Sequence, residues 1–226
     1  DCLLSRGLGD VYKRQEQVQE IALSELHEFK GHPFKVLDDE KMQETMESIR
    51  EHGVLMPGIA RPMKDGGYEI IAGHRRRHAC ELVGLTTMPM FIRDYTDDEA
   101  TIIMVDSNIQ REDILPSEKA KAYFMKYEAV KHQGKKGKGN SLDEVGETAG
   151  ESAKTVQRYI YLAHLSDALL DMVDKKKIGI VQGVELSFLT EQQQEWVQVV
   201  LEETGVIIST VQASRPVSYT HLTLPT

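Results

Sequence analysis

The segment YEIIAGHRRRHACELVG, Tyr68 to Gly84, joins a predicted strand to a predicted helix through one glycine, Gly73. The apolar run Tyr68 to Ala72 favours a strand, and Gly84 suits the end of the following helix. Three arginines, Arg75 to Arg77, fall in the first turn of that helix, where partial positive charge disfavours cations unless an anion is bound. The segment therefore predicts a phosphate site, with glycine allowing close approach of the backbone.

Two other interpretations of this segment remain open on local chemistry. The arginines equally suit a solvated helix face, on which Arg77 would pair with Glu81 at i,i+4. His74 and His78 have the i,i+4 spacing of a metal pair, but no further Cys or His lies close by in the sequence. A phosphate site and a solvated helix face therefore remain the two main interpretations of these arginines.

The flanking sequence alternates short strands with helices. Leu55 to Arg61 and Met88 to Arg93 favour strands, and Asp38 or Asp39 can cap a helix that precedes them. After Pro116 the predicted strands disappear and only helical spacing continues. We therefore predict an α+β chain, in which a mixed domain with a small sheet is followed by an all-helical domain.

A second pattern, Ser141 to Ile160, has helix-turn-helix spacing. The turn falls at Gly150, small Gly146 lets the two helices approach closely, and Val156 would point inward. Outward polar side chains on the second helix can read base edges, and nearby cations can contact phosphates. An ordinary helical hairpin with a solvated face would have the same spacing. The candidate DNA contacts are Lys135, Lys136, Lys138, Ser152, Lys154, Thr155, Gln157 and Arg158.

Between these two patterns lies VDSNIQREDILPSEKA, Val105 to Ala120. Asn108 and Arg111 stand at the end of one predicted helix, just before the next helix begins near Pro116. From there the two side chains can reach into a neighbouring pocket. They can equally serve as capping groups, which local chemistry favours.

Composition bounds the class of protein. The 226-residue chain has a formal charge of -9 and no run near the roughly 20 apolar residues of a membrane span. Its two cysteines, Cys2 and Cys80, cannot form a disulfide scaffold or a four-cysteine zinc site. We therefore expect a cytoplasmic protein without a membrane partner. The acidic balance excludes a charge-driven binder of nucleic acid, but it permits a small module that reads a specific site.

The two ends of the chain share one DNA word. DVYKRQ, Asp10 to Gln15, can be encoded by GAT GTG TAT AAG AGA CAG, and the reverse complement of that word gives VSYTH, Val217 to His221, in another frame. The pattern indicates translated sequencing adapter on both sides of a gene fragment. We therefore expect residues 1–15 and 217–226 to be adapter, and residues 206–216 to be a truncated continuation of the natural chain.

Together these segments resemble the ParB family of chromosome and plasmid partition proteins. The family strings GERRxRA and ENxQRxxL stand here as GHRRRHA and SNIQREDI, and SIREHGVLMPGIARP, Ser48 to Pro62, also matches. The resemblance runs from Ile21 to Gly205. It implies a ParB/sulfiredoxin-like nucleotide-binding domain over residues 16–115 and a helical DNA-binding domain over residues 116–205, with the helix-turn-helix at 141–163.

The resemblance also implies a nucleotide clamp that binds CTP and Mg²⁺. His74 and Ser107 stand where the family has acidic residues. Because Mg²⁺ prefers carboxylate oxygens, the loss at Ser107 predicts weakened metal binding and at most slow CTP hydrolysis. Asp106 is adjacent but would need a shifted backbone to substitute. Carried over by position, the nucleotide and phosphate contacts would be Gly53, Pro57, Gly73, His74, Arg75, Arg76, Asn108 and Arg111, with Asn108 nearest the metal.

The partners implied by the family are double-stranded DNA at a centromere-like or operator site, a second copy of the full-length chain, and a ParA-type ATPase. The implied location is the cytoplasm, in association with the nucleoid. Two alternatives keep the fold: an enzyme, either a nuclease or an ATP-using sulfiredoxin, and a transcription regulator without nucleotide binding. Sulfiredoxin chemistry needs a cysteine just before the His-Arg pair, where this chain has Gly73, and Cys80 lies nearly two turns further on.

Overall fold

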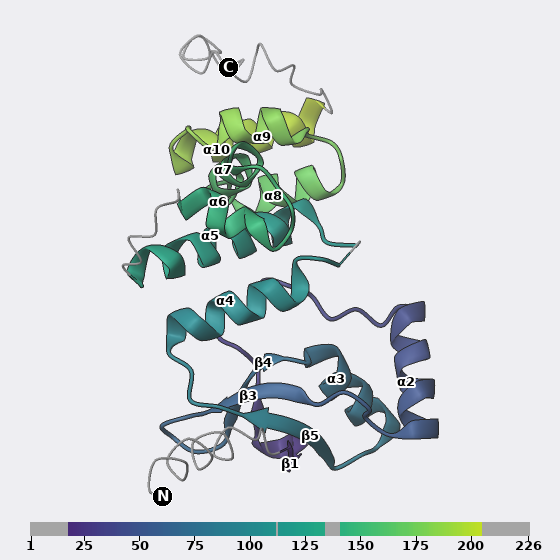
Figure 1. Ribbon diagram of the computed structural model, residues 1–226. Coiled ribbons are helices and arrows are strands. Elements are labelled where there is room, and N and C mark those ends of the chain that lie inside the picture. Colours follow the sequence, from purple (N-terminus) through teal and green to yellow (C-terminus); the bar gives the residue numbers. More distant parts are fainter. Residues whose placement is uncertain (1–17, 112, 134–140, 205–226) are drawn as a thin grey trace, which may run out of the picture. The chain divides into compact units, whose positions relative to one another are not determined.

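The computed structural model describes residues 18–111, 113–133 and 141–204 (Figure 1). The chain divides into two compact units, residues 1–96 and residues 97–226, which we describe one at a time. The first unit is a mixed sheet with helices, and the second is helical throughout its described part. The prediction of an α+β chain is confirmed. The helix α4 (Asp97–Asn108) groups with the helical unit, whereas the sequence analysis assigned it to the first domain.

The first unit is built on a five-stranded sheet with the order β1-β5-β3-β4-β2. In this sheet β3 runs antiparallel to β4 and parallel to β5, β1 is antiparallel to β5, and β2 is parallel to β4. The strands are β1 (Val18–Ala22), β2 (Leu26–His27), β3 (Gly58–Pro62), β4 (Tyr68–Ala72) and β5 (Thr87–Ile92). The strand β4 thus lies inside the sheet, which is consistent with its continuous apolar sequence.

Two helices, α2 (Glu40–His52) and α3 (His74–Val83), pack against each other in this unit. The apolar face of α2 contributes Met42 and Ile49 to the core, as its periodicity predicts. Ile70 of β4, Met88 and Met90 of β5, and Ala79 and Cys80 of α3 are buried in the same core. Because β4 runs straight into α3 through Gly73, the core fixes the position of the predicted phosphate site.

The predicted strands and helices of this unit are confirmed to within three residues at their ends. The strand predicted to begin at Leu55 begins instead at Gly58, because Leu55 and Met56 lie in a loop and are 72% and 73% exposed. The sequence analysis did not predict β1, β2 or the short 3-10 turn Leu23–Glu25. Only one residue of β1, Ile21, is buried, and β2 has two residues, so neither has a readable alternation.

The second unit is a bundle of short helices around one apolar core. The buried cluster includes Ala120, Leu162, Leu169, Leu170 and Leu186. The predicted all-helical character is confirmed in the described part of this unit, and one helix, whose sequence a glycine interrupts, was not predicted. The helices are α4, α5 (Pro116–His132), α6 (Ser141–Glu147), α7 (Ala153–Leu162), α8 (Asp167–Asp174), the unpredicted α9 (Ile180–Leu186) and α10 (Glu191–Thr204). In the ranges that the structure describes, no helix combines the length and apolar character needed to cross a membrane.

Candidate functional site

Gly73 forms the junction between β4 and α3. Its φ of 113° and ψ of 17° lie in the left-handed region, and a Cβ added there would stand 3.2 Å from the Cα of Gly58. Both the conformation and the close approach therefore require glycine. The first backbone bond of α3 runs from the amide of Arg77 to the carbonyl of Gly73, at 2.9 Å. The preceding amides lie in the turn where helix donors have no intrahelical partner, as a phosphate cradle requires.

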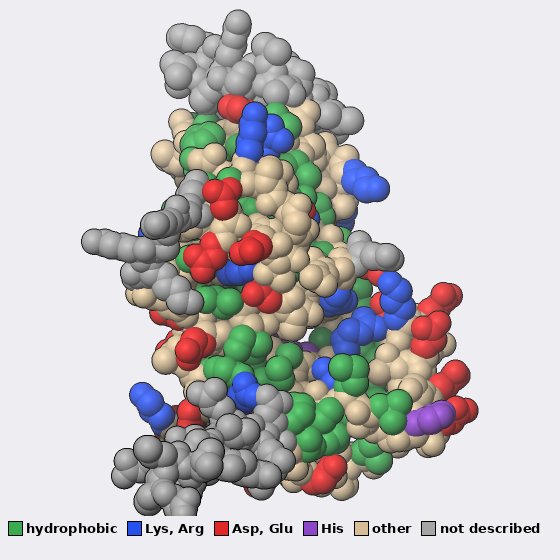
Figure 2. Space-filling model, in the orientation of Figure 1, with side chains coloured by type: hydrophobic (Ala, Val, Ile, Leu, Met, Phe, Trp, Pro, Cys, Tyr) green, Lys and Arg blue, Asp and Glu red, His purple; other side chains and the backbone are tan. Residues whose placement is uncertain are grey.

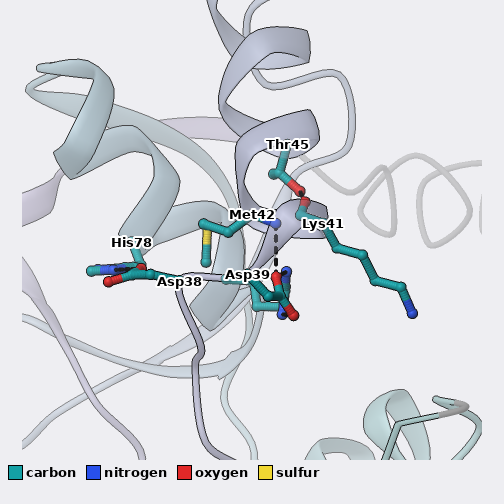
Figure 3. A network of polar contacts seen from close by, with 7 residues as sticks. Asp38, Asp39, Lys41, Met42, Thr45 and His78 are labelled. Carbon is teal, nitrogen blue, oxygen red and sulfur yellow. Dashed lines mark hydrogen bonds and ion pairs between the residues drawn. The ribbon is translucent and has the colours of Figure 1, made fainter.

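Arg75 carries an ion pair to the neighbouring helix rather than pointing freely into solvent. Its guanidinium lies 2.8 Å from Oδ1 of Asp39, and its side chain is 22% exposed. Asp39 is also the N-cap of α2, where Oδ1 accepts the amide of Met42 at 2.9 Å (Figure 3). The hydrogen bond from Arg75 is the main reason why the pKa of Asp39 is lowered. The first turns of α2 and α3 are thus joined at one point, and an anion reaching Arg75 would meet Asp39 as a competitor.

Arg76 holds the loop that follows α2. Its Nη1 donates to the carbonyl oxygens of Met56 and Pro57, the latter at 2.9 Å. Burial lowers the pKa of this guanidinium. The structure therefore brings Pro57 and Arg76 together with Gly73, while Gly53 ends α2 at the other end of the same loop, its amide bonded to Ile49 at 2.9 Å.

Arg77 pairs with Glu81 at 2.8 Å, which is the i,i+4 contact that the sequence predicts. Its side chain is mostly shielded, as is that of Arg75. The pair that the solvated-face interpretation predicts is thus present, and the arginine side chains are partly buried rather than fully exposed. Each of the three arginines has a carboxylate or carbonyl partner within the first unit.

His74, at the first position of α3, lies against a second histidine. Its ring centroid is 4.0 Å from that of His32, and its Nε2 is buried with no hydrogen-bond partner in the described part of the chain. Burial, reinforced by the nearby charges of His32 and Arg77, lowers the pKa of His74 to about 3. The imidazole is therefore neutral at neutral pH.

His74 and His78, whose spacing would also suit a metal pair, contact different groups in the structure. Nε2 of His78 lies 2.8 Å from Oδ1 of Asp38, and Figure 3 shows the two side chains together. Across residues 18–111, 113–133 and 141–204, no three Cys, His, Asp or Glu side chains gather as a metal site would require. His78 therefore helps to join α3 to the start of α2.

The neutral state of His74 predicts an acid-sensitive first unit. The unfolded chain takes up a proton at His74 near pH 6.5, whereas the folded chain resists protonation until about pH 3, so stability falls as the pH drops through this window. We expect the wild type to lose about 2–3 kcal/mol more than His74→Phe between roughly pH 7 and pH 4.5. Urea unfolding at both pH values measures this. The exposed His52→Gln serves as the control, and equal losses in wild type and His74→Phe would refute the prediction.

Asn108 and Arg111 belong to the second unit. Nδ2 of Asn108 donates to the carbonyl of Met104 at 2.8 Å and to Oγ of Ser107 at 3.2 Å, at the end of α4. The amide of Arg111 donates to the carbonyl of Asn108 at 3.0 Å. The Asn108 contacts are the capping role that local chemistry favours, whereas the Arg111 contact is made by its backbone amide. That both side chains approach the phosphate site at Gly73 stays a prediction.

The residues around Asn108 fit Mg²⁺ poorly. Ser107 donates its hydroxyl to the carbonyl of Met104 at 2.9 Å. The neighbouring carboxylate, Asp106, is held 2.6 Å from Nζ of the buried Lys126. Asp106 is therefore engaged elsewhere and does not replace the carboxylate that is missing at Ser107. We derive no chemical step through a metal here.

The helix-turn-helix pattern is formed by α6 and α7. Gly150 makes the turn with a φ of 67°, Ser152 caps α7 by accepting the amide of Thr155 at 3.2 Å, and Val156 is fully buried. A Cβ at Gly146 would lie 2.3 Å from the carbonyl oxygen of Glu151. The sequence interpretation of this segment is confirmed in its geometry.

The second helix of this motif presents a polar face. Lys154, Gln157 and Arg158 are exposed, and Thr155 is half-buried with its hydroxyl 3.0 Å from that of Ser152. Lys154 and Arg158 form no hydrogen bond or ion pair with the described residues, whereas Nε2 of Gln157 donates to the Tyr161 hydroxyl at 3.2 Å. This face therefore offers donors to an incoming ligand.

The other predicted basic contacts, Lys135, Lys136 and Lys138, lie outside the described residues. On the face drawn in Figure 2, the blue Lys and Arg side chains are interspersed with red Asp and Glu side chains in the described part of the chain. On this face, positive charge is thus local rather than spread over a broad surface, which is consistent with the net charge of -9.

The polar contacts that hold these two motifs in shape were not predicted, because they leave little signal in the sequence. Lys126 is 3% exposed, and its only sequence signal is a lysine at helical spacing from inward-facing Ala122 and Ala129. Asp39 was predicted as a cap, but its pairing with Arg75, 36 positions away, has no sequence signal.

Comparison with known proteins links the chain to one family. The model of the ParB N-terminal domain matches residues 9–109. A probable chromosome 1-partitioning protein ParB of Deinococcus radiodurans is 32% identical over 197 residues, which are 87% of this chain and 65% of that protein. The chromosome-partitioning protein Spo0J of Thermus thermophilus is 30% identical over 213 residues, which are 94% of this chain and 76% of that protein. The chain thus spans less than two thirds of the first relative.

A solved structure of a Pnob8-like ParB-N domain has the same fold. Its TM-score is 0.53 at 16% identity, and the alignment covers 90% of this chain and 96% of that chain. At this identity the similarity concerns the fold alone. It agrees with the mixed first unit followed by helices.

Proposed function

We propose, because the chain belongs to the ParB family of chromosome-partitioning proteins, that it binds double-stranded DNA at a specific site. The observation that carries this proposal is the polar face of α7. Arginine and glutamine make bidentate contacts to guanine and adenine edges, and Lys154 and Ser152 suit phosphates. In this proposal Gln157 and Arg158 read bases, and the lysine-rich segment around Lys135 contributes to binding of the DNA backbone.

Replacement of Arg158 by alanine tests this proposal. We expect about a tenfold loss of affinity for a selected duplex, since a bidentate base contact is worth roughly 1–3 kcal/mol. Affinity for a scrambled duplex should change much less. Fluorescence anisotropy at fixed salt measures both duplexes.

The control for lost charge is Lys177→Ala, which removes an exposed cation outside the helix-turn-helix. Equal losses for both duplexes in Arg158→Ala would assign Arg158 to the phosphate backbone. Equal affinities of the wild type for both duplexes would overturn specific binding itself.

We also propose that the first unit binds the triphosphate of CTP at the start of α3. The support is the left-handed Gly73 with free first-turn amides, and Arg75 beside them. Arg76 would act through the loop that it holds at Pro57, and His74 would line the site as a neutral ring. A contribution from Asn108 and Arg111 rests on the family resemblance alone. The choice of cytosine and the participation of Mg²⁺ rest on the family resemblance.

Arg75→Ala tests the nucleotide site. We expect CTP binding to weaken about tenfold, since a hydrogen bond to a charged group contributes about 1.5–3 kcal/mol and the release of Asp39 offsets part of it. Isothermal calorimetry with and without Mg²⁺ measures the affinity. Arg50→Ala removes an exposed arginine from α2 as the control. CTP binding that is unchanged in Arg75→Ala would remove this site, whereas a wild type that binds no CTP would favour a regulator without nucleotide.

The remaining roles concern the whole protein. By family resemblance, we propose that the full-length protein forms a homodimer, works with a ParA-type ATPase, and associates with the nucleoid in the cytoplasm. Thiol chemistry of the sulfiredoxin kind has little support, because Cys80 is fully buried and burial raises its pKa. Hydrolysis of CTP would be slow at most.

A further inference from the structure

We propose that three side chains from outside the helix-turn-helix, Gln110, Lys119 and Lys126, hold its turn and thereby position α7 for reading DNA. This inference rests on the proposed DNA-binding function. The three contacts all lie within the second unit. We call them the turn clamp.

Lys126 of α5 is the buried part of the turn clamp. Its ammonium group lies 2.6 Å from Oδ1 of Asp106, 3.2 Å from the carbonyl of Val145 and 3.2 Å from the hydroxyl of Thr148. Lysine has three donor hydrogens, and here three acceptors surround them. One acceptor belongs to α4, one to α6 and one to the turn. Lys126 therefore fixes the end of α6 against two other helices.

Gln110 and Lys119 hold the turn from its outer side. Nε2 of Gln110 donates to the carbonyl of Thr148 at 2.9 Å, across 38 positions of sequence. Nζ of Lys119 pairs with Glu151, and it also lies 5.0 Å from the ring centroid of Tyr159 on α7. The carbonyl and the hydroxyl of Thr148 and the side chain of Glu151 are thus bound by residues of α5 and of the segment between α4 and α5.

The backbone bonds of the turn amides run only to α6, so they do not fix the direction of α7. The amides of Ala149 and Glu151 both bond to the carbonyl of Gly146, at 3.1 and 3.0 Å, and Gly150 bonds to Glu147. Arg158 stands about 7.5 Å along α7 from its first residue, so a tilt of roughly 10° at the turn would move it by about 1.3 Å. That displacement exceeds the tolerance of a bidentate base contact. The clamp therefore sets specificity through position, without touching DNA.

Gln110→Glu is the sharpest test, because Gln110 is exposed and its loss leaves the core intact. Glutamate has the same length but cannot donate to the Thr148 carbonyl. Gln110→Lys keeps a donor and is the rescue variant. Gln192→Glu makes the same charge change at an exposed position of α10 and is the matched control. The probe is a duplex enriched from a random library by the wild-type chain, compared with its scrambled version.

In Gln110→Glu we expect the ratio of selected to scrambled affinity to fall about threefold to tenfold, as the loss of one hydrogen bond implies. Gln110→Lys should restore the ratio, and Gln192→Glu should keep it. The melting temperature should change little. A ratio that stays unchanged in Gln110→Glu, or a ratio that Gln192→Glu lowers equally, would overturn the proposal.

Amide hydrogen exchange separates failure of the clamp from failure of the proposed function. If the wild type enriches no duplex, specific DNA reading fails, and exchange still tests the clamp. Faster exchange at the amides of residues 148–156 in Gln110→Glu, with Gln110→Lys slow, supports the clamp. Unchanged exchange there overturns it.

Discussion

Gly146→Ala is expected to destabilise the helical unit by about 3 kcal/mol, near the upper end of the cost of overpacking. The added Cβ would lie 2.3 Å from the carbonyl oxygen of Glu151 and 2.9 Å from Cγ2 of Val156. The first of these atoms is backbone, so relief requires the turn to move away from α6. Because the same turn carries α7, specific DNA binding should be lost together with stability. Urea unfolding followed by circular dichroism, with anisotropy on the selected duplex, measures both.

Gly150→Ala is the matched control in the same turn. Gly150 has a φ of 67°, but a Cβ there would meet no atom within 4 Å. Alanine at this position pays only the penalty of the left-handed conformation, so the free energy of unfolding should fall by about 1–2 kcal/mol. Gly146→Ala thus tests the need for space between α6 and the turn, and Gly150→Ala tests the need for a left-handed backbone. A loss in Gly146→Ala that is no larger than the loss in Gly150→Ala would mean that α6 and α7 do not pack as closely as described.

The elements that sequence reasoning predicted are those whose local signals agree with their environment. The strand β4 is a continuous apolar run and is buried inside the sheet. Gly73 and Gly84 mark the two ends of α3. The helix α9 has the opposite character, because Gly183 interrupts an apolar sequence. A Cβ at Gly183 would lie 2.6 Å from Cδ1 of Leu162, so this glycine serves close helix packing that only the fold reveals. Local propensity alone therefore misses α9.

In the candidate phosphate site, too, part of the arrangement follows from local sequence and part only from the fold. The position of Arg75 and Arg76 at the start of α3 follows from sequence, and so does the need for an anion beside them. The anionic partner present in the structure is Asp39, and the carbonyls of Met56 and Pro57 serve Arg76. These groups are brought in by the packing of α2 and its following loop on α3. Sequence spacing could predict the demand for negative charge but not which group supplies it.

Asp106→Asn is expected to destabilise the second unit by about 3 kcal/mol, because it leaves the ammonium group of Lys126 buried without a counter-charge. The Lys126 side chain is 3% exposed and that of Asp106 is 30% exposed, so the lysine has no route to solvent when its partner is lost. The carbonyl of Val145 and the hydroxyl of Thr148 remain as neutral acceptors and compensate in part. Urea unfolding measures the loss.

The double variant Asp106→Asn with Lys126→Met should recover most of that loss, since removing both charges removes the unpaired one. Asp98→Asn is the control: it neutralises a carboxylate at the other end of α4, whose contact to His132 is 3.4 Å long. The experiment also decides between two roles for Asp106. A carboxylate free to bind Mg²⁺ would predict unchanged stability in Asp106→Asn with weaker metal-dependent CTP binding. If Asp106 instead serves the ion pair to Lys126, Asp106→Asn should lower the free energy of unfolding and leave the Mg²⁺ dependence of CTP binding unchanged.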